Sequence, residues 1–402
     1  MDLEKRLVSG APCDIYALAG SLFEFHPTVM NADGAEAAGI RCLFVLYGAA
    51  YYRHSANLDM LVDRDHPWSR ELLKRYNREK HCHAAASVVL QINDAIISDN
   101  IIHCRAGDEL CVLYESYRFP DRTVSVPLEK WPRELPVADF QVDDRVCLYL
   151  GSSGSFNYGH WLVDDLPRAK AWLELRQRMG ITCLIVMPSH GAKMNEVRLR
   201  SLRMLIDREV EVQFVASDRP FRLRNLHYVT PVSFHPRVKN PAAIHFVRSQ
   251  ALACIPAARE EPWRRLFIAR RPPNTRSIVN FNELWSFLAA RGFEMIEAEA
   301  LDFAEQTALF RDARVVVGQM GAAMTNTLFC RPATPLVYLA PIGWTEPFYL
   351  DLAAVGGQQY DVLAGAPTSD GPIHLSDFNV SVDHLYHRLT YMGFTEDLLP
   401  QV

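Results

Sequence analysis

The stretch Val315–Asn326 constrains the fold of this chain more than any other. It begins with three consecutive valines, a run typical of a buried parallel strand. The chain then turns through Gly318 and Gly321 into small residues that can start a helix. A strand, a glycine turn and a helix N-terminus favour an anion, because free backbone N–H groups and the helix dipole point toward it. Glycine also permits close helix–strand packing, so the turn alone leaves both interpretations open.

The size and composition of the chain predict a globular protein with two domains. It has 402 residues, of which 49% are hydrophobic and 22% charged. The net charge of −5 does not support nucleic-acid binding. No window is apolar enough to cross a bilayer, and the first residues lack the features of a signal peptide. Nine cysteines without framework spacing indicate free thiols, so we expect a cytoplasmic protein.

The first part of the chain predicts an α+β extension over residues 1–85. An apolar helix is expected over Ala35–Tyr52 and a basic helix over Arg70–Lys80. Turn signals at Asn93-Asp94, Asp99-Asn100 and 106–108 divide the next segment into a small sheet or β-meander. Its expected strands are Ser87–Ile92, Ala95–Cys104 and Glu109–Tyr117.

Two histidine–cysteine motifs raise the possibility of a zinc site. They are His81-Cys82-His83 and His103-Cys104. Alternate residues of a strand share a face, so His81 and His83 could converge. No CxxC or HxxxH spacing accompanies them, and no metal site is predicted.

From residue 145 onward, strands and helices alternate, which predicts βαβ units and mostly parallel sheets. The pattern gives one Rossmann-like domain over 86–235 and a second over 236–402, with the last helices returning to the first domain. Ligands of such sheets bind at the carboxyl ends of the strands. The strands expected in the first domain are 146–151, 183–188, 210–216 and 225–230, with helices at 158–179 and 195–206. A helix at 241–255 is expected to bring the chain across to the second domain, which has expected strands at 265–270, 293–298, 314–318 and 335–340 and helices at 282–291, 302–313 and 322–330.

A chemical motif occupies residues 157–168, after a Gly/Ser loop. In a helix, His160, Asp164 and Arg168 share one face because they are spaced by four. A histidine and a carboxylate together can hold and pass on a proton. Asp164–Arg168 could instead be an ordinary surface pair, and Pro167 could kink the helix or mark a new first turn.

A loop rich in arginine follows a predicted strand of the second domain. Arg270, Arg271 and Arg276 could neutralise a diphosphate, because guanidinium groups are always charged and bind in a bidentate manner. The alternative is a solvated basic loop. In the next helix, Glu305 and Gln306 could bind a sugar hydroxyl or simply cap the helix.

Four blocks of this chain resemble the signature of glycosyltransferase family 61. They are 157–168, 268–280, 303–310 and 316–326, and they occur in the order of the family. The resemblance implies a GT-B fold, in which two Rossmann-like domains face a cleft. It also implies inverting sugar transfer from a nucleotide sugar, UDP-linked in eukaryotic relatives, without a cofactor or an obligatory metal. Bacterial relatives are assigned to surface polysaccharide synthesis.

This resemblance implies a role for each candidate residue. The second domain would hold the donor, and the first would present Asp164 as general base, with His160 orienting it or sharing the role. We expect a glycan or lipid-linked acceptor and therefore peripheral contact with the inner face of the membrane. The acceptor-binding candidates are Asn157, Tyr158 and Arg168; the donor-binding candidates are Arg270, Arg271, Arg276, Asn280, Glu305, Gln306, Gln319, Gly321, Ala322, Ala323, Thr325 and Asn326.

Departures from the family pattern leave other functions open. Met320 stands where the family has histidine, Ala323 replaces a glycine, and Phe281 interrupts an Asn-Glu pair. An inactive protein that binds nucleotide sugars or glycans is the main alternative, and a sugar-nucleotide epimerase is another. A dehydrogenase is disfavoured because no GxGxxG follows the first strand of either half.

Overall fold

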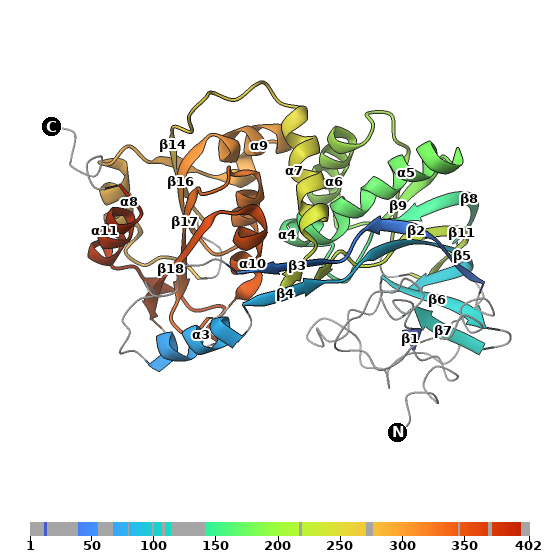
Figure 1. The fold of residues 1–402 in the computed structure, drawn as a ribbon, viewed down its shortest axis with the longest axis horizontal. Helices are drawn as coiled ribbons and strands as arrows, with labels where there is room; N and C mark the ends of the chain where they lie inside the picture. Colours follow the sequence, from blue (N-terminus) through green and yellow to red (C-terminus); the bar gives the residue numbers. More distant parts are fainter. Residues whose placement is uncertain are drawn as a thin grey trace. The chain divides into compact units, whose positions relative to one another are not determined.

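The computed structural model describes most of the chain and divides it into two compact units (Figure 1). Unit 1 comprises residues 1–50, 83–235 and 239–250, and unit 2 comprises 51–82, 236–238 and 251–402. This division assigns the expected N-terminal extension to both units, and it groups 239–250 with unit 1. The described residues are 12–13, 39–54, 67–78, 80–98, 100–106, 109–113, 141–216, 219–270, 276–344, 346–368 and 372–394.

Unit 1 contains one mixed sheet with the order β1-β7-β6-β5-β11-β8-β9-β10, and β2 also pairs with β5. From β11 to β10 the neighbouring strands are parallel, whereas β2, β5, β6 and β7 form an antiparallel part. The expected meander and the first α/β unit therefore share a sheet. The strands are β1 (Pro12–Cys13), β2 (Ile40–Tyr47), β5 (Ser87–Ser98), β6 (Ile101–Ala106), β7 (Glu109–Leu113), β8 (Gln141–Tyr149), β9 (Leu184–Pro188), β10 (Val212–Val215) and β11 (Phe221–Val229).

Two local predictions in this unit are wrong. The described part of the expected helix Ala35–Tyr52 forms β2 and the start of β3 (Ala50–Arg53), because β2 pairs along β5 and its residues Ile40 and Cys42 pack in the core of the sheet. The expected turn at Asn93-Asp94 is absent, since β5 continues and Asp94 adopts a positive φ of 62°. Pairing with β11 on both sides of Asp94 holds the strand extended.

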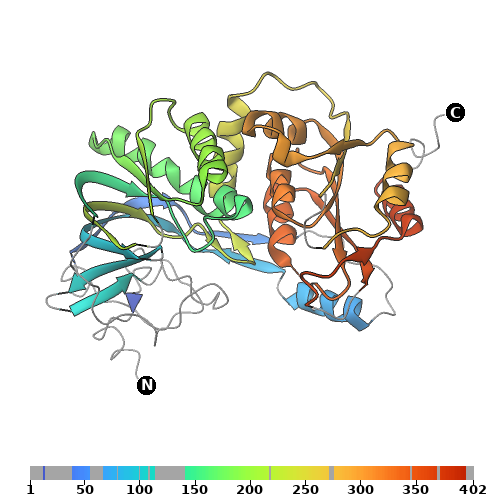
Figure 2. The ribbon, with the colours of Figure 1, turned by 180° about the vertical axis from the view of Figure 1, so that it is seen from behind.

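Helices cover one face of this sheet (Figures 1 and 2). The segment expected to be helical over 158–179 changes its winding three times, and Pro167 lies in the first turn of its 3-10 part. Proline fits there because the first turn needs no N–H partner. The helices of this region are α4 (Tyr158–His160), the π-helix η4 (Trp161–Asp165), the 3-10 helix η5 (Leu166–Ala169), α5 (Lys170–Met179), α6 (Ala192–Leu205) and α7 (Pro241–Ala253); the short strands β12 (Ser233–Phe234) and β13 (Val238–Lys239) precede α7.

Unit 2 contains a sheet with the order β15-β14-β16-β17-β18-β19, in which every pair except β18–β19 is parallel. The chain runs from β14 outward to β15 and then crosses back to β16, so β14 and β16 flank a topological switch point. Ligands of open α/β sheets bind at such points. The strands are β14 (Arg264–Ile268), β15 (Glu294–Ile296), β16 (Ala313–Gln319), β17 (Pro335–Pro341), β18 (Gln359–Pro367) and β19 (Phe378–Asn379).

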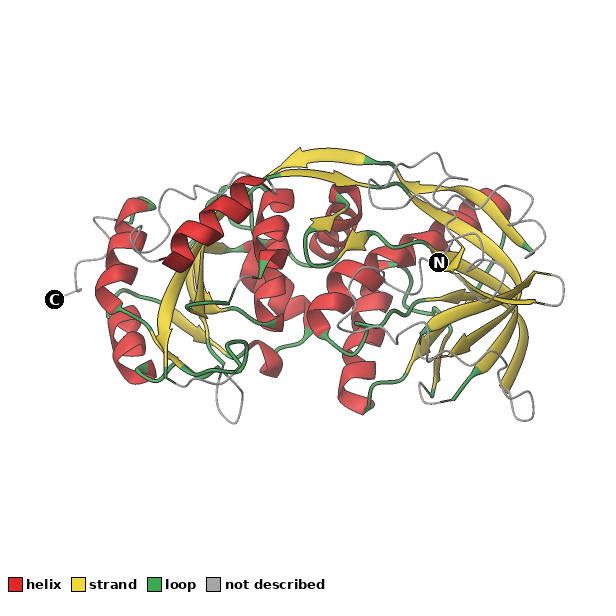
Figure 3. Ribbon diagram, turned by 90° about the horizontal axis from the view of Figure 1, so that it is seen from below, coloured by secondary structure: helices red, strands yellow, loops and turns green. Residues whose placement is uncertain are grey.

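Helices lie on both sides of this second sheet (Figure 3). Helix α11 packs against α8 in the same unit, so the expected return of the last helices to the first domain is not seen in α11. The segment after Gly321 is a 3-10 helix rather than the expected α-helix. The helices are α8 (Phe281–Ala289), the 3-10 helix η6 (Ala298–Ala300), α9 (Phe303–Arg311), the 3-10 helix η7 (Ala322–Phe329), α10 (Pro347–Gly356) and α11 (Val382–Tyr391).

A further helix and a two-stranded ribbon come from the early part of the chain. Helix α3 (Pro67–Arg78) contains most of the expected basic helix, and β3 pairs with β4 (His81–Ala84). Among the described helices, none has the length and hydropathy needed to cross a bilayer.

The buried His103 of β6 makes the stability of the protein dependent on pH. Burial lowers the pKa of His103 to about 4, from its usual value of 6.5. Between these values the unfolded chain binds a proton that the native chain does not, so stability falls as the pH drops. His103→Phe should remove about 3 kcal/mol of this loss between pH 7 and 4. Urea unfolding at both pH values measures the unfolding free energy. If the unfolding free energy of His103→Phe fell between pH 7 and 4 as much as that of the wild type, the prediction would be contradicted. His81→Phe, at an exposed position, is the control.

Candidate active site

The helical segment of unit 1 begins at Asn157, whose side chain caps it. Asn157 Oδ1 accepts a hydrogen bond of 2.8 Å from the N–H of Gly159. The following π-helical turn contains the adjacent residues Asp164 and Asp165, both buried. Single π-helical turns occur often at functional sites. Here the two carboxylates have separate sets of partners.

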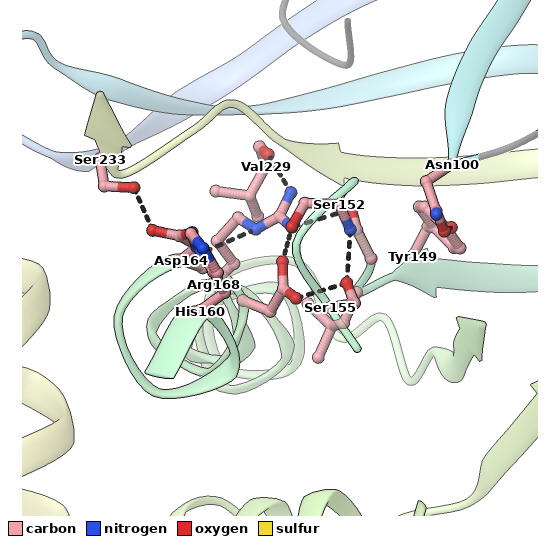
Figure 4. A network of polar contacts seen from close by, with 12 residues as sticks. Asn100, Tyr149, Ser152, Ser155, His160, Asp164, Arg168, Val229 and Ser233 are labelled. Atoms are coloured by element: carbon pink, nitrogen blue, oxygen red, sulfur yellow. Dashed lines mark hydrogen bonds and ion pairs between the residues drawn. The ribbon is translucent and has the colours of Figure 1, made fainter. Parts of the chain in front are cut away.

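Asp164 forms a polar cluster with His160 and Ser233. Asp164 Oδ2 lies 2.6 Å from His160 Nδ1, and Oδ1 accepts a hydrogen bond from Ser233 Oγ (Figure 4). Asp164 is 5% exposed, whereas the side chain of His160 is 19% exposed. The carboxylate is therefore engaged at both oxygens, and the imidazole is the more accessible of the two groups.

A second histidine lies beside this cluster. The rings of His160 and His235 have centroids 4.5 Å apart and are tilted by 57°. Ser233 and His235 follow β11 and come about 70 residues after His160, so neither spacing nor periodicity in the sequence pointed to them. The only available signal was their place after the carboxyl end of a strand, where ligands bind in parallel sheets.

Asp165 and Arg168 form a buried ion pair next to the cluster. Asp165 Oδ1 accepts a hydrogen bond from Arg168 Nη2, and Oδ2 accepts one of 2.6 Å from Ser155 Oγ. Arg168, which is 1% exposed, also donates to the backbone carbonyls of Asp164, Gly151 and Val229 at 2.9–3.2 Å.

An acceptor-binding role for Arg168 does not fit these contacts. Its guanidinium is buried, and its donors are directed at Asp165 and at the backbone carbonyls of Asp164, of Gly151 just after β8 and of Val229 at the end of β11. The expected one-face alignment of His160, Asp164 and Arg168 is therefore correct only for the first two residues. Tyr158, the third acceptor candidate with Asn157, is half-buried at the start of α4.

In unit 2, Arg270 and Gly321 meet at the switch point between β14 and β16. A Cβ atom built on Gly321 would lie 3.6 Å from Arg270 Nη1. Arg276, in the same loop, places its guanidinium 4.1 Å from the centre of the Trp344 ring. Gln319, which ends β16, donates from Nε2 to the backbone carbonyl of Arg276 and so fixes that loop.

The two arginines repel each other electrostatically. Burial, followed by the charge of Arg270, lowers the pKa of Arg276, while Tyr349 and Glu346 act in the opposite direction. A bound anion would relieve this repulsion. Arg271 lies outside the described residues.

Several other donor candidates have partners within the fold. Glu305 forms a capping box with Asp302, so the capping alternative is the one observed. Gln306 Oε1 accepts a hydrogen bond of 2.6 Å from Asn326 Nδ2, and both side chains are buried. Asn280 pairs with both backbone polar groups of Val380 at 2.7 and 2.9 Å. These contacts indicate structural roles.

The remaining candidates lie around the turn after β16. Ala322 and Ala323 are half-buried beside Gly321, whereas Thr325 is completely buried. Met320 is 1% exposed and its N–H donates to the Leu339 carbonyl at 2.9 Å. The position at which the family has histidine therefore contributes no polar side chain here.

Comparison with known proteins identifies the class of this chain. Residues 158–337 match the family model Glycosyltransferase 61, a region that includes both the Asp164 cluster and the switch point of unit 2. The protein is a glycosyltransferase. The matching model is that of the family which the four sequence blocks resemble.

Other comparisons add little. The crystal structure of TibC, a dodecameric iron-containing heptosyltransferase in complex with ADP-D-β-D-heptose, is similar at 14% sequence identity and a TM-score of 0.29. The similarity covers 64% of this chain and 80% of that one. No curated protein matches the chain.

Arg168 should be required for folding. Arg168→Met leaves the carboxylate of Asp165 buried without its cationic partner, which should cost about 3–5 kcal/mol of unfolding free energy. Chemical denaturation measures this loss. The control is Arg200→Met, which removes an exposed ion pair with Glu196 and should change stability by less than about 1 kcal/mol. A stable Arg168→Met protein with impaired acceptor binding would instead restore the acceptor-binding role.

Two glycines of the turn should respond differently to alanine. A Cβ on Gly318 would lie 2.9 Å from Ile268 Cβ and would also collide with Met324, so Gly318→Ala should destabilise unit 2 by about 1–3 kcal/mol. Gly321 has extended backbone, and a Cβ added there would make only ordinary van der Waals contacts, so Gly321→Ala should fold normally. Thermal unfolding of both variants checks this; equal stability of the two would contradict the packing role of Gly318.

Proposed function

We propose that this glycosyltransferase transfers a sugar from a nucleoside-diphosphate sugar to a hydroxyl acceptor, with inversion at the anomeric carbon and without an obligatory metal. The observation that supports it most is the convergence of Arg270 and Arg276 at the switch point of unit 2. A UDP-linked sugar is the expected donor and a glycan or lipid-linked molecule the expected acceptor. The proposed fold is GT-B, with two Rossmann-like domains. The proposed role is in surface polysaccharide synthesis at the cytoplasmic face of a membrane.

The donor diphosphate would bind where Arg270, Arg276 and the backbone at Gly321 come together. Two fixed positive charges relieve their mutual repulsion by binding an anion. The same charges stabilise the nucleotide as negative charge develops on the leaving oxygen, which is the electrostatic task of a metal-free site. Trp344 packs on one face of Arg276 and holds its guanidinium in position.

The base would be His160, with Asp164 as its orienting partner. This reverses the order expected from the sequence. Both oxygens of Asp164 are engaged, one with His160 Nδ1 and the other with Ser233. A carboxylate on Nδ1 fixes the tautomer that leaves Nε2 able to accept a proton, and it stabilises the imidazolium that forms. The acceptor hydroxyl would lose its proton to Nε2 as it attacks the anomeric carbon in line with the departing diphosphate.

The alternative is a protein that binds a nucleotide sugar or glycan without turning it over. The specific observation in its favour is Met320, whose buried side chain occupies the position of the family histidine and supplies no donor or proton carrier.

Nucleotide binding tests the donor site directly. A thermal-shift screen of nucleoside diphosphates and nucleotide sugars should give a rise in melting temperature with at least one ligand, because a ligand of the native state stabilises it by mass action. The rise should not require added Mg²⁺ and should be lost in Arg270→Ala. Arg259→Ala, at an exposed arginine of the same unit, is the control. A screen without any shift would argue against the donor site.

The proton-transfer roles predict different kinetic defects. Once donor and acceptor are identified, His160→Ala should lower kcat by about 10³-fold or more, and Asp164→Asn by about 10²–10⁴-fold through the wrong tautomer. Donor affinity should be unchanged in both, because the donor residues are in unit 2. Near-normal turnover of His160→Ala would exclude His160 as the base. Absence of turnover in the wild type on all acceptors, with intact donor binding, would support the alternative.

A further inference from the structure

Three buried side chains of unit 2 converge on one point, outside the residues used in the proposed reaction. His54 follows β3, Cys82 is in β4 and Asp351 is in α10. Their exposed fractions are 7%, 5% and 0%. His54 Nε2 lies 2.9 Å from Asp351 Oδ1 and 3.1 Å from Cys82 Sγ, and the three atoms lie within 4.8 Å of one another.

The arrangement differs from a catalytic Cys–His–Asp triad. In a triad, the nucleophile and the carboxylate contact opposite nitrogens of the imidazole. Here the thiol and the carboxylate both contact Nε2. The cluster is also too buried to meet a substrate. A nucleophilic role is therefore disfavoured.

One proton on His54 Nε2 cannot satisfy both of its contacts, with Asp351 Oδ1 and with Cys82 Sγ. Nε2 carries at most one proton, which can be directed at only one of its two neighbours, the Asp351 oxygen or the Cys82 sulfur. Without it, the nitrogen lone pair faces a carboxylate oxygen at 2.9 Å, which is repulsive unless that oxygen is protonated. The same oxygen already accepts a hydrogen bond of 2.5 Å from the Tyr52 hydroxyl. A cation bound at this point would interact favourably with all three atoms.

We propose that His54, Cys82 and Asp351 bind a divalent transition-metal ion of the zinc class. An imidazole nitrogen, a thiolate and a carboxylate oxygen are the ligand types that zinc takes in proteins. Ligand atoms around a tetrahedral zinc lie about 3.3–3.6 Å apart, so His54 Nε2 would need to move away from the Asp351 oxygen and from the Cys82 sulfur by only about half an ångström each. The fourth position would be filled by a further ligand such as water.

The site is structural and does not belong to the sugar-transfer chemistry. It would fasten the ends of β3 and β4 to helix α10. The residues whose spacing first raised the question of zinc do not assemble: His81 is exposed on the opposite side of β4 from Cys82, and His103 and Cys104 are in unit 1. Only Cys82 of those motifs takes part, with two residues far away in the sequence.

The first test is the metal content of the intact chain, purified without a chelator or a metal-affinity step. Elemental analysis after dialysis should find about one zinc or similar ion per wild-type chain. Cys82→Ala and Asp351→Asn should lose at least about four-fifths of it. Cys330→Ala, at another buried cysteine of the same unit, should retain it. Equal metal content in all four proteins would overturn the assignment.

A second measurement does not depend on the folding of the variants. Metal-free wild type titrated with Co²⁺ should develop a thiolate-to-cobalt charge-transfer band, which Cys330→Ala keeps and Cys82→Ala lacks. A chelator should lower the melting temperature of the zinc-loaded wild type, since metal bound only by the native state adds to its stability. A wild type without bound metal, cobalt band or chelator response would show that the trio is a hydrogen-bonded core cluster. None of these readouts depends on nucleotide binding, so they test the metal site independently of the proposed function.

Discussion

The candidate active site of unit 1 depends on the buried guanidinium of Arg168. It joins the carboxylate of Asp165 to three backbone carbonyls, one of them just after strand β8 and one at the end of β11. A buried charge of this kind is costly unless it is paired and hydrogen-bonded, and here each of the three guanidinium nitrogens has a partner. The contacts hold the irregular helical segment against the carboxyl ends of the strands. The neighbouring Asp164 is thereby kept beside Ser233 and His160.

In unit 2, as in unit 1, some of the candidate residues form the site and others support the fold. At the switch point the sheet brings together two arginines that follow β14 and a glycine that follows β16, and the mutual repulsion of the two arginines makes the place suited to an anion. Side chains that resemble ligands in sequence, such as Asn280 and Asn326, are instead occupied with backbone and side-chain partners. Helix α10 contributes Tyr349 and Glu346 near Arg276, and it contributes Asp351 to the His54–Cys82 cluster.

Much of the fold could be predicted because local signals agree with the tertiary structure. The valine run, the Asp302–Glu305 capping box and the alternation of strands and helices after residue 145 are examples. The prediction failed at Ala35–Tyr52, where an apolar run fits helix and strand equally well and pairing with β5 decides between them. It failed again at Asp94, since turn residues are tolerated inside a strand when both neighbours pair.

The sequence by itself determined the resemblance to glycosyltransferase family 61, the pairing of His160 with Asp164 at helical spacing, and the basic segment after β14. These depend on short separations along the chain, which local geometry translates directly into proximity. Only the tertiary structure decided that Arg168 is a buried support, that Ser233 and His235 join the cluster, and that Cys82 meets His54 and Asp351 rather than His81 and His83. Contacts between residues 28 to almost 300 positions apart arise from strand order and packing, which no local pattern encodes.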